Sequence, residues 1–290
     1  VLDKKAAGMG NKSTHSVGGA RRGAGRETMM GAAECSGKTD GTRKRLLGHW
    51  VPFAVWVGVI LLLQVAALVW TLPRWIYPVS YAAKSLVCAA LLLYFRPWRG
   101  QPGLRATDWA LGLLAGVLVA VLWILPETPW AGRLWPGLQA FYYRWLVFPP
   151  GRFPSYLDPA IFPELPYNHP SLAYSPAEAG WGLVALKLLG SAGVIAVIEE
   201  YFFRGFLYRW IRGTRLPLAE TGSFDAAAFW TVVVLFGFEH DRWLAGLAAG
   251  IVYGSLAVRT GRIAPAVVAH VTTNLLLGIY VIVSGQYGFW

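Results

Sequence analysis

Residues 193–210 read GVIAVIEEYFFRGFLYRW, an apolar stretch that holds two adjacent carboxylates, Glu199 and Glu200, with Arg204 one helical turn later. A charged side chain at the centre of a bilayer costs about 2.5–3.5 kcal/mol on insertion scales. Packing alone does not explain three such groups so close together. The stretch therefore predicts a membrane-spanning helix with a functional site inside it.

The composition is that of a membrane protein. Of the 290 residues, 56% are hydrophobic and 14% are charged, whereas a soluble domain is typically about 45–50% apolar and about 25% charged. The chain has 15 Trp, a residue enriched at membrane–water interfaces. Its formal charge of +11 would suggest nucleic-acid binding in a soluble protein. Here the basic residues collect in particular loops, so membrane topology explains them and we expect no nucleic-acid partner.

We expect an all-α polytopic membrane protein in which about seven helices, within a range of six to eight, form a bundle around an intramembrane polar site, since a span needs about 20 predominantly apolar residues. The expected spans are 50–72, 76–95, 108–125, 178–212, 226–240, 243–258 and 263–283. Between the third and fourth, we expect an interfacial amphipathic helix over 134–148. Residues 149–176 read as an ordered loop because prolines recur there.

Residues 1–48 are rich in Gly, Ser, Thr, Lys and Arg and have no apolar period, so they predict a disordered basic tail before an integral membrane domain over 49–290. Basic residues precede the first span and recur in alternate loops, which places the N-terminus in the cytoplasm and the C-terminus outside. On this topology Glu199 and His270 fall in the cytoplasmic half and His240 toward the outer end of its helix. Helix tilt, or a boundary shifted by a turn, would have to bring them together.

The charged cluster divides into two roles. Glu200 and Arg204 are spaced i,i+4 with the acid first, which predicts an ion pair. Glu199 lies about 100° away around the helix, so the two carboxylates should not face one site, and Glu199 is the freer group. The alternative, that Glu199 only hydrogen-bonds a neighbouring helix, is disfavoured by its cost in lipid.

Two further helices carry polar pairs at i,i+4 spacing, Phe236 with His240 and His270 with Asn274. A lone His on an apolar helix is more often a satisfied core residue, but that reading would require several costly groups to be buried independently. The other histidines, His15, His49 and His169, lie in the tail or in loops, and we expect solvated or turn roles for them. We interpret Glu239 and Asp241 as marking the membrane edge.

This set of side chains suits peptide hydrolysis. A buried carboxylate can act as general base toward water, a neutral imidazole can orient that water, and Asn274 could donate a hydrogen bond to a developing oxyanion. Alternatively, His240 and His270 with Glu199 or Glu200 could hold a divalent metal such as zinc with an open position. The residues alone leave both versions open.

Three motifs in this order resemble a known family. EEYFFR at 199–204 fits EExxxR, FGFEH at 236–240 fits FxxxH, and HVTTN at 270–274 fits HxxxN. Together they resemble the CAAX protease and bacteriocin-processing (CPBP) family, also called the abortive-infection family, which are intramembrane endopeptidases. The resemblance covers about 178–283. The Trp-rich C-terminus, ending GQYGFW, and the long loop before the fourth helix resemble a bacterial branch associated with exosortase systems.

The resemblance implies a multi-pass protein of the bacterial inner membrane that cleaves a membrane-associated peptide or protein. Glu199 would be the catalytic base, His240 would help to activate water, and His270 with Asn274 would hold the water or stabilise the oxyanion. The supporting residues would be Glu200, Arg204 and Phe236. Both a metal-dependent and a metal-free, glutamate-based mechanism are consistent with the family pattern.

Two other functions compete with proteolysis. A non-enzymatic membrane scaffold or immunity protein could retain the motifs as a structural polar core. A small transporter could use Glu199 and the histidines as a proton relay, but it would need a polar path across both leaflets. The first three spans offer only Gln64 and Lys84 for such a path.

Overall fold

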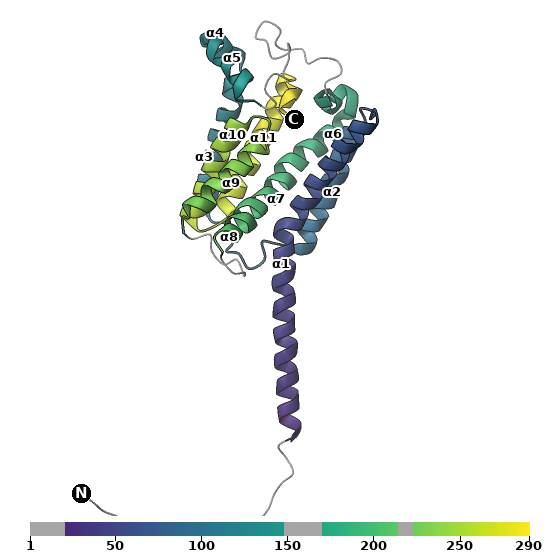
Figure 1. Ribbon diagram of the computed structural model, residues 1–290, viewed down its shortest axis with the longest axis vertical. Coiled ribbons are helices and arrows are strands. Elements are labelled where there is room, and N and C mark those ends of the chain that lie inside the picture. Colours follow the sequence, from purple (N-terminus) through teal and green to yellow (C-terminus); the bar gives the residue numbers. More distant parts are fainter. Residues whose placement is uncertain (1–20, 148–169, 214–222) are drawn as a thin grey trace, which may run out of the picture. The chain divides into compact units, whose positions relative to one another are not determined.

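The computed structural model describes residues 21–147, 170–213 and 223–290. These ranges contain helices, turns and loops and no strand, which confirms the all-α prediction (Figure 1). The longer helices are α1 (Arg21–Val69), α2 (Ile76–Phe95), α3 (Ala106–Ile124), α6 (Pro176–Leu189), α9 (Ala226–Phe238), α10 (Trp243–Thr260) and α11 (Ala264–Ser284). The shorter segments are η1 (Leu125–Glu127), α4 (Pro129–Leu134), α5 (Pro136–Trp145), η3 (Pro170–Tyr174), η4 (Gly190–Ile195), α7 (Ala196–Glu200), η5 (Tyr201–Leu207), α8 (Tyr208–Ile211) and η6 (Tyr287–Phe289).

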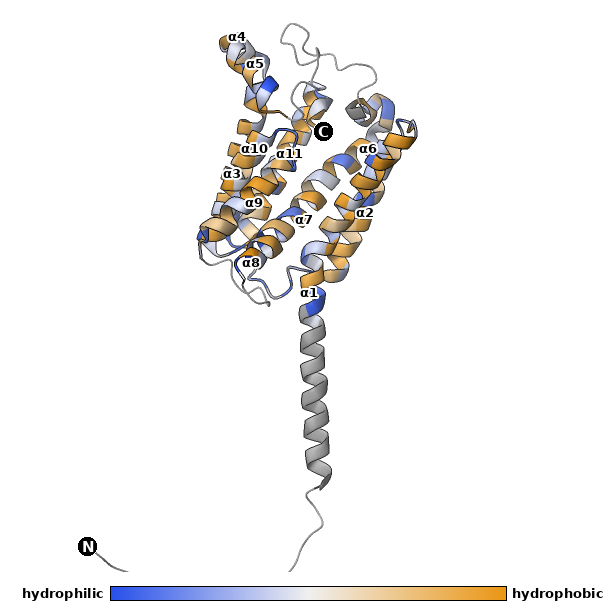
Figure 2. Cartoon of the chain, viewed as in Figure 1, coloured by the Kyte–Doolittle hydropathy of each residue, from blue (hydrophilic) through white to orange (hydrophobic). Residues whose placement is uncertain are grey.

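Six helical segments in the described ranges are long and apolar enough to cross a membrane, which confirms an integral, multi-pass protein. Hydrophobic residues cover most of the helical bundle (Figure 2). The six segments are Arg43–Val69, Ile76–Phe95, Ala106–Glu127, Pro176–Ile211, Trp243–Thr260 and Ala264–Ser284. The helix expected as the fifth span, α9, has 13 residues. At about 1.5 Å per residue it is about 20 Å long, shorter than a hydrocarbon core of about 30 Å.

The chain divides into two compact units, residues 1–43 and 44–290. Helix α1 begins at Arg21, inside the segment for which the composition predicts disorder. Helix propagation adds one hydrogen bond per residue once a nucleus exists, so the apolar span that follows can extend a helix backwards through a weak sequence. Residues 1–20, with His15, lie outside the described residues, as does His169.

The fourth span enters π-helical winding twice and is kinked near its start at Gly180, where φ is 75° and ψ is 155°. Helix α6 begins at Pro176, and the Ser175 side chain caps it by accepting a hydrogen bond from the Glu178 backbone N–H at 3.3 Å. The π-helical segments η4 and η5 then flank α7, and α8 ends the path. Figure 1 shows this inclined helix running between α2 on one side and α9–α11 on the other. The residues of α7 therefore lie between these two groups of helices.

Helices α3 and α11 pack closely because α3 presents Gly112 and Gly116 toward α11. A Cβ added at Gly112 would lie 2.6 Å from the Cβ of Val268, and one at Gly116 would lie 2.6 Å from the backbone oxygen of Ala269. This spacing of two glycines is the small-xxx-small pattern that lets membrane helices approach. The contact fixes α11, the helix of His270, against α3.

Buried ion pairs tie loops together at two places. Arg262 pairs with Asp108 at 2.5 Å and donates to the Pro102 carbonyl oxygen at 3.1 Å, so the α2–α3 and α10–α11 loops lie at the same end of the bundle. Elsewhere, Arg242 donates to Glu127 at 2.9 Å and to the Gly288 carbonyl oxygen at 3.1 Å. Burial lowers the pKa of Arg242, but the charge and hydrogen bonds of Glu127 raise it overall above its usual range.

Two local expectations need correction. The helix expected over 134–148 begins at Pro136 and ends at Trp145 as α5, since Pro136 begins a new helix where its missing N–H costs nothing, and the short helix α4 ends before it at Leu134. His49 is not solvated: it is 3% exposed, and a Cβ at Gly205 would lie 2.6 Å from its ring.

We predict that Gly116→Ala destabilises the bundle by about 1–3 kcal/mol, because the added methyl group meets a backbone oxygen that cannot move aside. The measurement is the thermal unfolding midpoint of the purified protein in detergent, which should fall. Gly58→Ala in α1 is the matched control, since nothing lies within 4 Å of a Cβ added there. Equal midpoints for the two variants would contradict the proposed α3–α11 contact.

Candidate active site

The two carboxylates of the opening motif lie on α7, between the two π-helical segments. Glu199 is 6% exposed and Glu200 is fully buried. π-Helical turns inside α-helices are rare and are found frequently at functional sites, because each extra residue in a turn redirects the side chains that follow. No residue pattern indicates either turn, although both decide which way the motif residues face.

Glu200 has the two partners that hold the centre of the site together. Arg204 donates from Nη1 to Glu200 Oε1 at 2.8 Å, the ion pair predicted from the i,i+4 spacing. His270 places its Nδ1 3.0 Å from the same oxygen. Arg204 also donates to the Gly250 carbonyl oxygen at 3.3 Å and lies 4.4 Å from the ring centroid of Phe236. Glu200 thus links the fourth span to α11 as well as to its own arginine.

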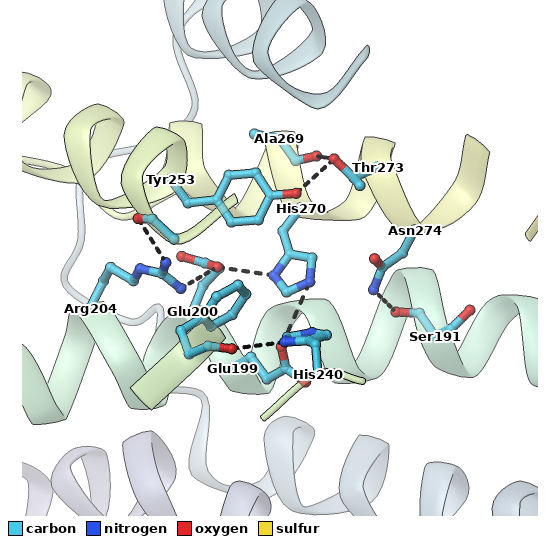
Figure 3. Close-up of polar contacts among 12 residues, drawn as sticks. Ser191, Glu199, Glu200, Arg204, His240, Tyr253, Ala269, His270, Thr273 and Asn274 are labelled. Atoms are coloured by element: carbon cyan, nitrogen blue, oxygen red, sulfur yellow. Dashed lines mark hydrogen bonds and ion pairs between the residues drawn. The ribbon is translucent and has the colours of Figure 1, made fainter. Parts of the chain in front are cut away.

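His270 lies between the two carboxylates (Figure 3). Its Nδ1 faces Glu200, and its Nε2 is 3.7 Å from Glu199 Oε2. The expectation that Glu199 and Glu200 cannot face one site is therefore wrong, because one imidazole ring offers a nitrogen to each. A carboxylate paired with Arg204 can only accept a hydrogen bond, so Nδ1 carries the proton. The Nε2 atom is then left to face Glu199.

His240 joins the site from the turn after α9. Its Nδ1 is 2.8 Å from the Phe236 carbonyl oxygen, which can only accept, so this nitrogen carries the proton and Nε2 is left as an acceptor. The ring packs edge-on against Trp123 at 5.3 Å. Because α9 is shorter than a full span, its end reaches the level of Glu199. The expected separation of His240 from Glu199 and His270 is therefore absent.

A cavity of about 340 Å³ adjoins these side chains. The sequence-predicted residues that line it are Glu199, Phe236, His240, His270 and Asn274. Glu200 and Arg204 lie behind this wall. Asn274 donates from Nδ2 to the Ser191 carbonyl oxygen at 2.9 Å, and the second N–H of that amide remains to donate elsewhere. The seven predicted residues thus form one cluster, divided into a wall that faces the cavity and a support behind it.

Two residues of the site were missed by the sequence reasoning. Tyr253 of α10 stacks on the His270 ring at 5.0 Å between centroids, and its hydroxyl donates to Thr273 Oγ1 at 2.7 Å. Both residues line the cavity. Thr273 follows His270 by three positions, so helical spacing could have placed it on the same face. Nothing in the local sequence distinguishes Tyr253 from other aromatic residues of the spans.

The donors expected for a metal do not converge. Two imidazoles and a carboxylate are ligands that zinc uses, and a histidine held by a carboxylate through its other nitrogen is typical of such sites. Within the described part of the chain, however, no three His, Cys, Asp or Glu side chains are placed to share one ion. We therefore derive no catalytic step through a metal, and the zinc alternative with His240, His270 and Glu199 or Glu200 is decided by metal analysis of the purified protein.

Residues 181–276 match the family model described as type II CAAX prenyl endopeptidase Rce1-like. The matched segment contains all three motifs, and the family resemblance read from them is confirmed. No curated protein and no solved structure matches the chain.

We predict that Glu200→Gln destabilises the protein by about 3–5 kcal/mol, because it leaves the Arg204 charge buried without its partner. Thermal unfolding in detergent measures the loss. The double variant Glu200→Gln with Arg204→Met removes both charges and should recover most of it. Additive losses in the double variant would show that the two residues do not stabilise the fold as a pair.

Proposed function

We propose that the protein is an intramembrane endopeptidase that hydrolyses a peptide bond of a membrane-associated peptide or protein with water activated by Glu199. The Rce1-like match supports this activity at the level of the family. The observation that carries the proposal for this chain is that Glu199, His240, His270 and Asn274 line one cavity, although they come from three separate segments.

In the proposed reaction, Glu199 takes a proton from a water molecule as the water oxygen attacks the substrate carbonyl carbon. The second O–H of that water donates to an unprotonated imidazole nitrogen, Nε2 of His240 or Nε2 of His270, which orients the water. The remaining N–H of Asn274 donates to the oxyanion that develops on the carbonyl oxygen. Glu199 then gives its proton to the leaving amine nitrogen, so that the C–N bond breaks and the carboxylate is restored.

Glu200 and Arg204 have a positioning role in this mechanism. Glu200 holds the Nδ1–H of His270, which fixes the tautomer and the orientation of the ring. Arg204 holds Glu200 in place by a hydrogen bond of 2.8 Å, and Tyr253 stacks on the imidazole of His270. None of these three is required to touch the substrate. Their effect on the reaction passes through His270.

A scaffold or immunity protein with the same polar core is the rival function. A core built only for stability has no need of space beside its charged groups, since unpaired buried polar groups are costly. Glu199 Oε2 and Glu200 Oε2 both lack a hydrogen-bond partner among the described residues, but of the two carboxylates Glu199 is the one that lines the cavity. This favours an open working carboxylate over a satisfied structural one.

We predict that Glu199→Gln lowers the rate of substrate cleavage by about 10²–10⁴-fold, the usual contribution of a general base. Mass spectrometry of membrane peptides from cells with the wild type, with Glu199→Gln and without the protein identifies the products and their loss. Glu178→Gln is the matched control, since Glu178 lies at the start of the same span but pairs with Arg74 at 3.6 Å near the surface. Cleavage that persists in Glu199→Gln would refute the mechanism.

We predict that the purified, active protein contains less than stoichiometric zinc and keeps its activity in the presence of a chelator, because the described ligands do not converge. Elemental analysis of the same preparation used for the activity assay measures the metal. A stoichiometric metal whose removal abolishes cleavage, and whose return restores it, would establish the metal-dependent version instead.

A further inference from the structure

The two histidines of the proposed mechanism are held in different ways. His270 Nδ1 meets a carboxylate, that of Glu200, at 3.0 Å, and Tyr253 stacks on its ring. His240 Nδ1 meets a neutral group, the carbonyl oxygen of Phe236 four residues earlier, at 2.8 Å, and hydrogen bonds to charged groups are the stronger kind. His240 also lies in the turn between α9 and α10, outside both helices. Its ring therefore depends on a further contact to stay in one orientation.

The orientation of the His240 ring decides whether it can hold water. The torsion of a histidine about its Cβ–Cγ bond is broad, with about two favourable settings. A half-turn from the observed setting exchanges Nδ1 with Cδ2 and Nε2 with Cε1. A C–H group would then stand where the acceptor nitrogen lies, and the ring could not accept a hydrogen bond from the attacking water there. The proposed mechanism therefore requires the observed setting.

Trp123 of α3 supplies a contact from outside the helix of His240. Its ring centroid lies 5.3 Å from that of His240, and the two planes are inclined by 75°, an edge-to-face arrangement that aromatic rings favour. The Phe236 ring also contacts the imidazole, at 4.9 Å, but it belongs to the same helix end. Trp123 and His240 both line the cavity. Removal of the indole would leave room for the imidazole to rotate and for water to reach Nδ1.

Helical geometry fixes the direction in which Trp123 points. Gly112, Gly116 and Trp123 lie within about 40° of one another around the axis of α3. The two glycines are the positions at which α3 approaches α11 most closely, so they mark the face of α3 that is turned into the bundle. Trp123 lies on that face, near the end of α3 at Ile124. The close packing of α3 on α11 therefore also holds the indole in the cavity wall.

The turn that carries His240 is attached to the same end of α3. Arg242, two residues after His240, donates from Nη2 to Glu127 Oε2 at 2.9 Å. Glu127 belongs to η1, the segment that follows α3, and both partners of this ion pair are buried. Trp123 precedes Glu127 by four residues. Two neighbouring positions at the end of α3 thus contact two neighbouring positions of one turn, the ion pair at its backbone and the indole at its imidazole.

We propose that Trp123 is a positioning residue for His240: its indole confines the imidazole, so that Nδ1 stays on the Phe236 carbonyl oxygen and Nε2 stays available to the attacking water. This inference rests on the proposed endopeptidase function and adds to it a residue outside the three motifs. The Glu127–Arg242 pair fixes the turn, and Trp123 fixes the ring that the turn carries. The effect of Trp123 on the reaction passes through His240 and needs no contact with the reacting atoms.

The direct test is nitrogen-15 NMR of the full chain, labelled on histidine, in lipid nanodiscs at neutral pH, with His240→Asn used for assignment. It reports which ring nitrogen of His240 carries the proton, whether or not the protein cleaves a peptide. The wild type should hold the proton on Nδ1. Trp123→Leu should raise the tautomer with the proton on Nε2 to about half of the population, because the torsion has about two settings. Trp123→Phe keeps a ring at this position and should resemble the wild type.

Cleavage measures the consequence for the reaction. The substrate is a synthetic peptide that spans a cleavage site found by the mass spectrometry of membrane peptides. Trp123→Leu should lower kcat by up to about 10²-fold, the cost of a misplaced catalytic group, and leave KM within about twofold of the wild type. Trp123→Phe should restore most of kcat. Trp109→Leu is the matched control, since Trp109 also lies on α3 but is 49% exposed and outside the cavity lining. This variant should change neither the tautomer of His240 nor kcat.

The thermal unfolding midpoint in detergent shows whether Trp123→Leu is folded. If it is not, Trp123→Met takes its place, since Met fills irregular gaps without a ring. A proton that stays on Nδ1 in the folded variant without the ring would overturn the inference. So would a kcat that falls equally in Trp123→Leu and Trp123→Phe, since the ring contact would then not be the cause. Failure of the proposed function looks different: the wild type cleaves no peptide, while Trp123→Leu still shifts the tautomer of His240.

Discussion

A single carboxylate oxygen, Oε1 of Glu200, is the constraint on which the rest of the site depends. It accepts from Arg204 on its own helix and from His270 on α11. A buried carboxylate in a membrane span is costly unless it is paired and hydrogen-bonded; both partners contact Oε1, and Oε2 has no hydrogen-bond partner among the described residues. The two partners also join the fourth span to α11. The position of His270, and through it the geometry around Glu199, follows from this contact.

The interaction explains why two adjacent glutamates can differ in role while they face the same histidine. Glu200 is fully buried behind the cavity wall, and its charge is neutralised by Arg204. Glu199 lies against the cavity, 3.7 Å from the other nitrogen of His270. Glu200 fixes the orientation of the His270 ring, and Glu199 remains available as the proposed general base.

Much of this arrangement follows from the sequence, and the rest depends on packing. The i,i+4 spacings predicted the Glu200–Arg204 pair and put His270 and Asn274 on one face, and apolar length predicted the spans. Composition does not indicate the π-helical turns around α7, so the direction in which the Glu199 side chain points could not be predicted from the sequence. The short length of α9 was visible in the sequence. The position of His240 at the level of Glu199, which follows from that length, depends on the turn between α9 and α10. Tyr253 reaches His270 only through the packing of α10 on α11.

The central claim, that Glu200 holds His270 so that its Nε2 atom is free to face Glu199, is open to a direct measurement. Nitrogen-15 NMR of histidine-labelled protein in lipid nanodiscs, with His270→Asn used for assignment, reports the protonation of each ring nitrogen. The account predicts a proton on Nδ1 and none on Nε2 of His270 at neutral pH, and loss of this preference in Glu200→Gln. A proton on Nε2 with Nδ1 bare in the wild type would contradict it.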